Sequence, residues 1–168
     1  TQNARNGKKG RIISKMNALL EPETIAALYE ASEAGVEIDL IVRGVCALKP
    51  GIPGVSENIR VRSIVGRFLE HTRAFYFHND GAEDVYLSSA DWMDRNFFRR
   101  VEVSFPVLDA KLRKRVINEG LKPYLEDNCQ AWDMDQDGHY SLCSPRRGKP
   151  QAAQEVLLEM LARAQLPG

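Results

Sequence analysis

Residues 11–42 read RIISKMNALLEPETIAALYEASEAGVEIDLIV, and this stretch decides the fold class. Its first residues, 11–16, predict a short strand. Pro22 then suits a first helical turn, apolar side chains follow at helical spacing, and Gly35 is a natural stop. Residues 36–42 alternate and then become wholly apolar, which is typical of a strand that enters a covered sheet. This strand–helix–strand order predicts an α/β unit with a right-handed crossover.

The middle of the chain predicts further strands around this unit. Residues 59–65 and Val101–Phe105 each predict one strand. Phe75–Phe77 and Val85–Leu87 predict a hairpin, because the sequence Asn79-Asp80-Gly81 between them is typical of a tight turn. We therefore expect an α/β fold in which a mixed sheet lies between helices.

The C-terminal part of the chain predicts two helices separated by an irregular segment. Leu108–Leu125 predicts a helix that begins after Asp109 as its N-cap. Residues 127–150 predict irregular structure, and Ala152–Ala164 predicts a short amphipathic helix.

The two ends of the chain suggest how it is organised. The opening sequence TQNARNGKKG is polar and basic, which indicates a piece of a longer protein. We expect one domain over residues 1–148, followed by a helical tail over residues 149–168.

The composition favours a globular domain of a reducing compartment. Lysine and arginine number 23, as do aspartate and glutamate, so net charge argues neither for nor against a polyanionic partner. Cys46, Cys129 and Cys143 are widely spaced and form no C-x-x-C pair, which argues against a disulfide scaffold or a structural zinc site. The sequence shows no signal peptide and no apolar run near the roughly 20 residues that span a bilayer. We expect a cytoplasmic protein without a transmembrane segment, and peripheral membrane association stays open.

Arg43 is the first candidate functional residue. It directly follows the apolar strand at 36–42 and precedes Gly44. Ligands of open α/β sheets bind at the carboxyl ends of strands, and a guanidinium group offers a planar fork that matches phosphate oxygens. The alternative is a surface arginine at a strand end, and position alone does not decide between the two.

His71 is the second candidate, just before the expected strand at Phe75–Phe77. A histidine can exchange a proton near neutral pH or donate to a phosphate oxygen when charged. Arg73 follows two residues later and would share its side of a strand. The alternative is a solvated histidine at a strand edge.

A third candidate segment follows the strand at Val85–Leu87, which ends in the sequence SSADWMDRN at 88–96. Two serines at the start of a turn or helix offer hydroxyl and backbone N–H groups, a favourable arrangement for an anion. The candidate phosphate-binding residues of this segment are Ser88, Ser89, Asp91 and Arg95.

The combination of H-x-R, two strands and S-S-A-D-x-x-x-R-N resembles the phospholipase D superfamily, whose members carry H-x-K-x4-D. Here Arg73 stands at the Lys position and His78 at the Asp position. These departures count against a phosphodiesterase or nuclease of that superfamily, which stays as an alternative. They point instead to the polyphosphate kinase family, whose catalytic half is built from two phospholipase D-like domains.

The resemblance to polyphosphate kinases extends from about Arg11 to Leu142 and rests on IVRGVCALKPG, NIRVRSIVGRFLEHTRAFYF and VYLSSADWMDRN. It implies reversible transfer of the terminal phosphate of ATP onto inorganic polyphosphate. It also implies that Arg43, in V-R-G, contacts the nucleotide and that His71, in L-E-H, is the second active-site histidine. Arg43 would then stabilise developing charge, and His71 would protonate or hydrogen-bond the leaving or entering phosphate.

The resemblance further implies that part of the active site lies outside this chain. In the family the phosphorylated histidine lies in a K-T-H-A-K-type segment of a preceding domain, together with the arginines assigned to magnesium. This chain contains no such segment, so we expect it to be catalytically incomplete alone. The expected ligands are ATP or ADP as substrate, polyphosphate, and Mg²⁺ bound by residues outside this chain. The expected partners are the preceding domains and further copies in a homo-oligomer.

Two segments resemble other kinds of site. Asp133–Gly138 imitates the start of an EF-hand, but Ser144 stands where a bidentate Glu is needed, so we expect an acidic surface turn without calcium. The family's G-x-Y-x-R segment is represented at 138–142 without its Arg, and we assign it no function.

Several arginines crowd together and could form a nucleic-acid surface. Arg60 and Arg62 would share one face of a strand, but acidic residues are interspersed, and Phe68, Phe75 and Phe77 are spaced as core residues. We therefore expect a solvated face and no nucleic acid, with polyphosphate as the better polyanion. A non-catalytic polyanion-binding module stays as a second alternative. The arginines in question are Arg60, Arg62, Arg67, Arg73, Arg95, Arg99 and Arg100.

Overall fold

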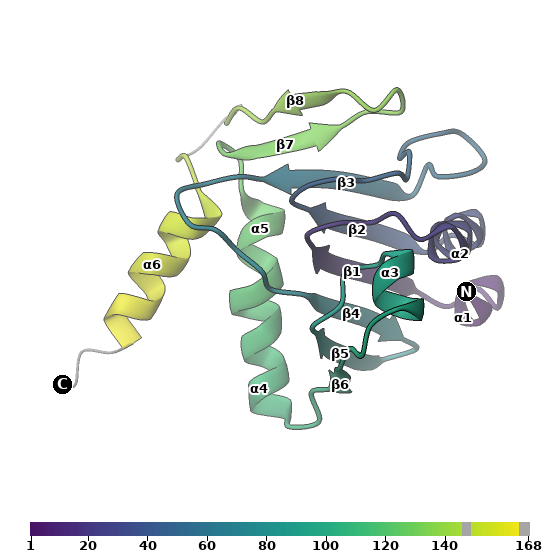
Figure 1. Cartoon of the computed structure of the whole chain (residues 1–168), viewed down its shortest axis with the longest axis horizontal. Coiled ribbons are helices and arrows are strands. Elements are labelled where there is room, and N and C mark those ends of the chain that lie inside the picture. Colours follow the sequence, from purple (N-terminus) through teal and green to yellow (C-terminus); the bar gives the residue numbers. More distant parts are fainter. Residues whose placement is uncertain (146–148, 165–168) are drawn as a thin grey trace.

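The structure, a computed structural model, describes residues 1–145 and 149–164. The strands form one eight-stranded sheet in the order β6-β5-β4-β1-β2-β3-β7-β8 (Figure 1). They are β1 (Gly10–Met16), β2 (Glu37–Val42), β3 (Ile59–Ile64), β4 (Ala74–Asn79), β5 (Ala82–Ser88), β6 (Ser104–Pro106), β7 (Ala131–Met134) and β8 (Tyr140–Leu142). The helices are α1 (Gln2–Arg5), α2 (Pro22–Glu33), α3 (Asp94–Phe98), α4 (Ala110–Arg115), a π-helical segment (Val116–Leu121), α5 (Lys122–Glu126) and α6 (Ala153–Ala164).

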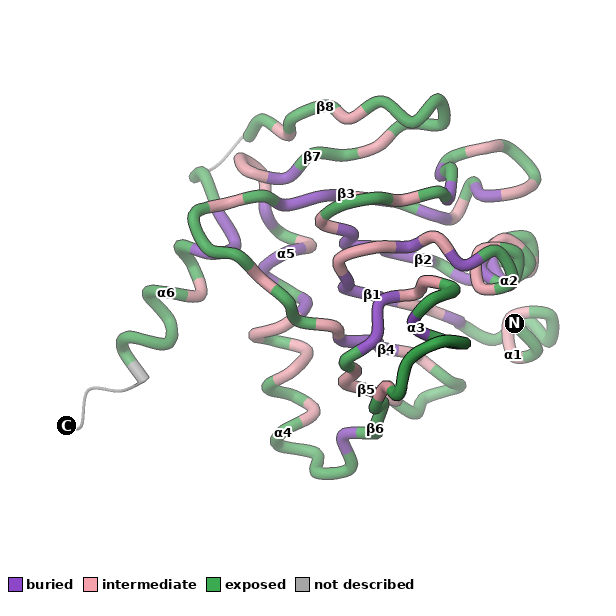
Figure 2. Tube along the Cα trace, in the orientation of Figure 1, coloured by how far each residue is buried: buried purple, intermediate pink, exposed green. Residues whose placement is uncertain are grey.

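The sheet is mixed and lies between helices, which confirms the expected fold class. Strands β1, β2 and β3 are parallel neighbours, and each of the other pairings is antiparallel. Figure 2 marks the buried positions along the strands in purple. Two clusters of buried apolar residues pack on the sheet. One joins the sheet to α2 through residues such as Leu28 and Leu40. The other joins it to the α4–α5 segment through residues such as Ile41 and Tyr124.

Local sequence explains the predicted strand–helix–strand unit. Pro22 stands at the first helical position of α2, and the Glu21 side chain caps the helix by accepting from the backbone N–H groups of Glu23 and Thr24. Gly35 has a φ of +88°, in the left-handed region that lets the chain leave the helix toward β2. Strands β1 and β2 pair in parallel on either side of this connection in the sequence.

The predicted hairpin is also present, since β4 and β5 pair antiparallel around the Asn79-Asp80-Gly81 turn. Asp80 has a φ of +52° and Gly81 a φ of +93°. Two consecutive residues with positive φ are typical of the tight hairpin turns whose twist matches that of the strands.

The region after β5 departs from the sequence-based expectation in three places. Strand β6 covers only Ser104–Pro106, so the strand predicted over Val101–Phe105 was expected to begin too early in the sequence. The helix expected over Leu108–Leu125 is divided by the π-helical segment Val116–Leu121, although Asp109 caps it as predicted, accepting from Lys111 N at 2.8 Å and Leu112 N at 2.9 Å. The expectation of irregular structure over residues 127–150 was wrong, because this stretch contains β7 and β8.

The C-terminal helix was predicted well, with α6 beginning at Ala153. Within the described residues no helix is both long enough and apolar enough to cross a membrane. The three cysteines are free.

Strand directions define one edge of the sheet that matters for function. Because β1, β2 and β3 are parallel, their carboxyl ends lie together at this edge. The start of β4 and the end of β5 lie there too, since Lys15 pairs with Ala74 and Ala74 with Leu87. We call it the carboxyl edge. The β7–β8 turn lies at the opposite edge, since β7 runs antiparallel to β3 from Ala131 beside Ile64.

Candidate functional site

Arg43 lies at the carboxyl edge, directly after β2, as its sequence position predicted. Its backbone is fixed on both sides, because its N–H donates to Met16 O at 3.2 Å and its carbonyl accepts from Ser63 Oγ at 2.8 Å. Its guanidinium Nε donates to Asn17 Oδ1 at 2.9 Å. Within residues 1–145 and 149–164 no partner hydrogen-bonds its two terminal nitrogens, which leaves a fork of donors available to an anion.

Asp91 is buried at the same edge and holds two neighbouring groups together. Its Oδ1 accepts from the backbone N of Asn17 at 2.7 Å, and its two oxygens accept from Arg73 Nε at 3.1 Å and Nη2 at 2.9 Å. Burial opposes ionisation of this carboxyl, yet the hydrogen bonds from Arg73 and from the Asn17 backbone hold the pKa of Asp91 below its usual value. Its oxygens are thus occupied by protein groups, which favours a positioning role over direct contact with phosphate.

His71 lies in the connection between β3 and β4, residues 65–73, which we call the His71 loop. The loop runs from the end of β3 to the start of β4 and so crosses the carboxyl ends of β2 and β1 (Figure 1). The expectation that His71 and Arg73 share one side of a strand was wrong, because β4 begins only at Ala74. His71 is exposed, and its carbonyl accepts from Arg73 Nη1 at 3.0 Å.

These contacts form a continuous chain from one predicted phosphate-binding residue to the other. In order, its members are Arg43, Asn17, Asp91, Arg73 and His71. Sequence reasoning missed Asn17, and nothing in the motifs singled it out. Arg73 was noticed as a departure from H-x-K, but its pairing with Asp91 depends on the fold.

A second polar network lies beside Arg43 and was also missed. Lys15, at the end of β1, ion-pairs with Glu70 of the His71 loop, and its Nζ lies 3.7 Å from the centre of the Tyr124 ring. Burial lowers the pKa of Lys15. The sequence analysis placed Lys15 only in the short strand expected at residues 11–16 and gave it no role.

Ser88 and Ser89 are used mainly to hold the segment before β6. Ser88 Oγ donates to Val103 O at 3.3 Å and accepts from Ala90 N at 3.0 Å. Ser89 Oγ accepts from Val103 N at 3.0 Å and donates to Glu102. Neither serine stands at a helix start, because α3 begins at Asp94, and a phosphate-binding role for these hydroxyls stays a prediction.

Arg95 lies in α3 and is exposed. Among the described residues, no side-chain hydrogen bond or ion pair joins Arg95 to the chain of contacts from Arg43 to His71. The structure therefore brings Arg43, Asp91 and His71 into one connected group, while Arg95 stands apart from it.

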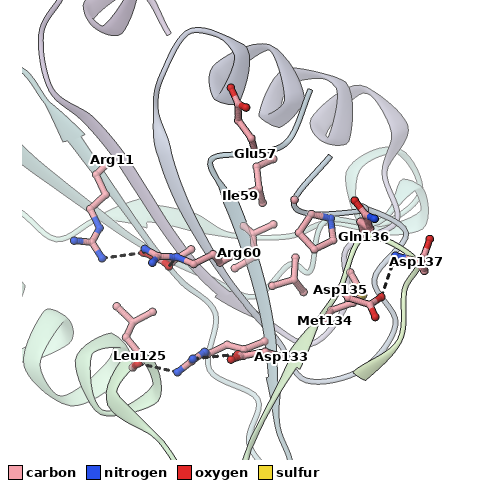
Figure 3. A pocket seen from close by; sticks show the side chains of 16 residues that line it. Arg11, Glu57, Ile59, Arg60, Leu125, Asp133, Met134, Asp135, Gln136 and Asp137 are labelled. Atoms are coloured by element: carbon pink, nitrogen blue, oxygen red, sulfur yellow. Dashed lines mark hydrogen bonds and ion pairs between the residues drawn. The ribbon is translucent and has the colours of Figure 1, made fainter. Parts of the chain in front are cut away.

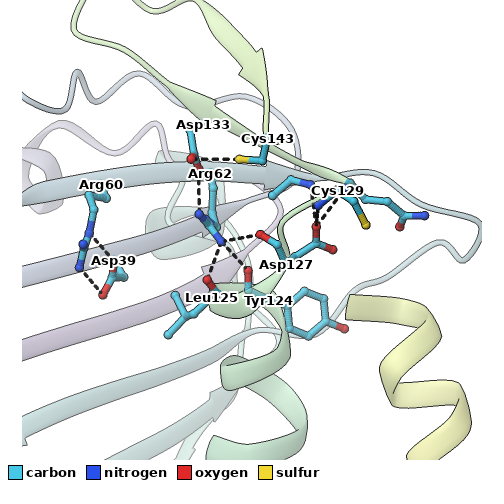
Figure 4. A network of polar contacts seen from close by, with 11 residues as sticks. Asp39, Arg60, Arg62, Tyr124, Leu125, Asp127, Cys129, Asp133 and Cys143 are labelled. Carbon is cyan, nitrogen blue, oxygen red and sulfur yellow. Dashed lines mark hydrogen bonds and ion pairs between the residues drawn. The ribbon is translucent and has the colours of Figure 1, made fainter. Parts of the chain in front are cut away.

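The largest cavity, about 680 Å³, contains none of the predicted site residues (Figure 3). Arg60 and Arg62 both line it, and their two-residue spacing within β3 places them on one face of the strand, as predicted. Their charges are paired within the protein, because Arg60 binds Asp39 and Arg62 binds Asp133 (Figure 4). Arg62 is largely buried and caps the end of α5 by donating to Leu125 O at 2.7 Å, so of these two arginines the expectation of a solvated face holds for Arg60 and not for Arg62. Paired charges and an acidic rim make this cavity a poor site for a polyanion.

The acidic turn at the β7–β8 hairpin is exposed and lies at the edge opposite Arg43. Asp135 Oδ1 accepts from Asp137 N and His139 N, each at 2.9 Å, and the hydrogen bond from the His139 backbone is the main cause that lowers the pKa of Asp135. Among the described residues, Asp135, Asp137 and His139 are the one group of side chains close enough together to share a metal ion. The absence of calcium there stays a prediction.

Magnesium does not fit the carboxyl edge as the described residues form it. Glu70, which is partly buried, accepts from Lys15, Tyr124 and Gln154. Asp91, which is buried, accepts from Arg73 and Asn17. Because Mg²⁺ needs oxygen ligands that are free to coordinate it, we derive no catalytic step through a metal in this chain.

Comparisons with known proteins identify relatives of the chain and of its fold. A family model described as "Polyphosphate kinase C-terminal domain 2" matches residues 1–154. Similar relatives are named polyphosphate kinase in Burkholderia lata, 66% identical over 161 residues, and in Paraburkholderia phytofirmans, 64% identical over 156 residues. These alignments cover 96% and 93% of this chain and 23% of each relative.

A solved structure is similar over nearly the whole chain. The crystal structure of polyphosphate kinase from Porphyromonas gingivalis matches with a TM-score of 0.92 and 45% identity, covering 97% of this chain and 25% of that one. The chain thus spans about a quarter of the length of the relatives that it matches.

Proposed function

Because the chain belongs to the family of the polyphosphate kinase C-terminal domain, we propose that it forms part of an enzyme that transfers the terminal phosphate of ATP reversibly onto inorganic polyphosphate. The observation that carries this proposal is the hydrogen-bonded chain from Arg43 to His71 at the carboxyl edge. It joins Arg43, whose guanidinium fork is available, to the backbone carbonyl of His71 at the end of the sheet where α/β proteins bind ligands.

The proposed reaction moves a phosphoryl group in two steps. The γ-phosphoryl group first passes to a histidine nitrogen outside this chain, and its bond to the bridging oxygen of the departing ADP breaks. It then passes from that histidine to the terminal oxygen of polyphosphate, which grows by one unit. Transfers of this kind depend on positioning and on stabilising the charge of the phosphoryl oxygens.

The residues of this chain would supply that stabilisation. The terminal nitrogens of Arg43 donate to phosphoryl oxygens, and the bond from Nε to Asn17 fixes the plane of the fork. His71 donates a hydrogen bond or a proton to the oxygen that leaves or enters. The charge of Arg73 is neutralised by Asp91, so Arg73 serves to hold the His71 loop.

The remaining features of the proposal rest on the family resemblance. They are a phosphorylated histidine and Mg²⁺ ligands in a preceding domain, a homo-oligomeric parent protein, and a cytoplasmic location. Ser88, Ser89 and Arg95 remain proposed neighbours of the bound phosphates. The division into a domain at 1–148 and a tail at 149–168 also remains a proposal, although Ala152, Ala153 and Gln154 are buried against the rest of the fold.

The test uses the full-length parent protein with labelled ATP and a polyphosphate primer. Wild-type protein should lengthen the polymer, and His71→Ala should lower turnover about 10²-fold with a smaller change in nucleotide affinity. Arg43→Lys keeps the charge but loses the planar fork, so affinity and rate should both stay poor. His139→Ala is the matched control, because this exposed histidine lies at the opposite edge.

Three results would contradict the proposal. If the turnover rate of His71→Ala stayed within a few-fold of wild type, His71 would be a solvated loop residue without a catalytic role. Cleavage of a phosphodiester without polymer growth would indicate a hydrolase of the phospholipase D superfamily. Polyphosphate binding by the wild type without any transfer would indicate a non-catalytic polyanion-binding module.

A further inference from the structure

The His71 loop is fastened to the first turn of α6 by a single buried side chain. Gln154 is 6% exposed, and its amide bonds both backbone groups of Phe68. Its Oε1 accepts from Phe68 N at 2.8 Å, and its Nε2 donates to Phe68 O at 2.8 Å. The amide thus pairs with the loop backbone much as a neighbouring strand would, and it fixes the loop three residues before His71.

Glu70, the residue directly before His71, is held from three directions. Its Oε1 accepts from Gln154 Nε2 at 2.7 Å, and its Oε2 accepts from Tyr124 OH at 2.6 Å and from Lys15 Nζ. Burial opposes ionisation, but the hydrogen bonds from Lys15, Tyr124 and Gln154 hold the pKa of Glu70 below its usual value. Strand β1, helix α5 and helix α6 therefore meet at one carboxylate of the loop.

The loop is shaped to accept Gln154. A Cβ atom added at Gly66 would lie 2.8 Å from Gln154 Cδ, which is closer than Cβ atoms approach other side chains. The Gln154 amide therefore fits here only because residue 66 is a glycine. Phe68 itself is exposed, contrary to the expectation that it belongs to the core, so burial of its ring does not hold the loop.

The first turn of α6 is in turn anchored to the corner between α5 and β7. Asp127 is buried, and its Oδ2 accepts from Ala153 N at 2.7 Å. Its Oδ1 accepts from the backbone N–H groups of Cys129, Gln130 and Ala131 (Figure 4). Gln154 consequently holds the loop from a rigid base.

We propose that Gln154 and Glu70 form a clamp through which α6 positions the His71 loop over the carboxyl edge, which makes Gln154 a positioning residue of the catalytic site. This inference rests on the proposed function, because it assigns a purpose to the placement of His71. It predicts that loosening the clamp slows the chemical step more than it weakens nucleotide binding, since Arg43 is fixed separately by Met16, Asn17 and Ser63.

The experiment compares two variants of the full-length protein. Gln154→Met keeps a side chain of similar length but removes all three hydrogen bonds to the loop. Asp109→Ala is the matched control, because it removes the N-cap of α4 and lowers stability without touching the loop. Two readouts are recorded for each variant: hydrogen exchange of the peptide that covers residues 65–73, and kcat and KM for ATP with a polyphosphate primer.

We expect Gln154→Met to raise exchange in residues 65–73 at least tenfold and to lower kcat about tenfold, with KM for ATP within twofold of wild type. Asp109→Ala should change neither readout more than twofold. Unchanged exchange in Gln154→Met would overturn the clamp, and faster exchange with wild-type kcat would overturn its role in positioning. If wild-type protein transfers no phosphate, the proposed function fails, while the exchange measurement still decides whether the clamp exists.

Discussion

Asp91 and Arg73 form a bidentate ion pair whose side chains are 10% and 20% exposed. The sequence motif S-S-A-D marked Asp91 as a candidate phosphate neighbour, because the residue type and its place after a strand are compatible with a ligand site. The motif could not show that Arg73 and the Asn17 backbone occupy both oxygens, since these partners lie 18 and 74 residues away. Arg43 was predictable because its placement depends only on the end of its own strand.

The pair predicts a specific effect of pH on stability. Asp91→Asn leaves the Arg73 guanidinium largely buried without its counter-ion, which should lower the free energy of unfolding by about 2–3 kcal/mol at neutral pH. Because the pKa of Asp91 is lowered in the folded state, the unfolded chain binds its proton first as pH falls. The stabilisation is therefore complete above the ordinary Asp pKa of about 3.9 and is lost as pH falls toward the folded value.

Urea unfolding of wild type and variant from neutral pH down to about pH 3 measures this difference. The gap between the two should narrow only below about pH 4. A gap that is already closed at neutral pH would show that the ion pair does not stabilise the fold.

The elements fall into two groups according to what determines them. Strands β1 and β2, helix α2 and the β4–β5 hairpin carry their own local signals in periodicity, capping and turn residues, and each was predictable. Strands β7 and β8 carry weak local signals, because AWDM and YSL are short and flank an acidic turn. They become strands because β7 pairs with β3 and β8 pairs with β7. These are contacts between distant parts of the chain, which local sequence does not reveal.

The π-helical segment Val116–Leu121 is a departure of a different kind. The helical pattern of residues 108–125 was visible, but the wider turn inside it, whose hydrogen bonds join residues five apart, was not. Such segments are often found near functional sites, and this one is followed at once by α5, which carries Tyr124 to Glu70.

Two glycines allow a matched test of the element geometry. Gly81→Ala forces a side chain into a φ of +93° in the β4–β5 turn and should lower the free energy of unfolding by about 1–2 kcal/mol. Gly120→Ala meets only Val116 Cγ1 at an ordinary 3.8 Å, and Gly120 is not among the glycines with positive φ. It should be neutral or stabilising by up to about 1 kcal/mol. Thermal and urea unfolding of both variants check this contrast, and equal losses would contradict the assigned turn geometry.

At the scale of the whole molecule, the family was predictable because three long segments carried the resemblance, and the comparisons confirm it. The mixed sheet between helices is likewise confirmed. The linkage of Arg43 to His71 was not predictable, because its members come from four different parts of the chain, namely Asn17, Arg43, the segment of His71 and Arg73, and Asp91. The clamp on the His71 loop was hidden for the same reason, since Gln154 lies 84 residues from Glu70.

The last prediction concerns the chain by itself. Its sheet and both apolar clusters are complete within the described residues, so the purified chain should fold and unfold cooperatively. It offers a guanidinium fork and an imidazole, but the carboxylates of Glu70 and Asp91 at the carboxyl edge are engaged and its sequence contains no K-T-H-A-K-type segment. With labelled ATP, magnesium and polyphosphate, we expect no polymer growth above background and no acid-labile phosphohistidine.

Addition of the full-length protein to the same mixture is the control for the reagents. Robust synthesis by the chain alone, or label on one of His71, His78 or His139, would show that the nucleophile lies within these 168 residues. His71 would then have to be reconsidered as the residue that carries the phosphate, because it is the histidine joined to Arg43 through the network at the carboxyl edge.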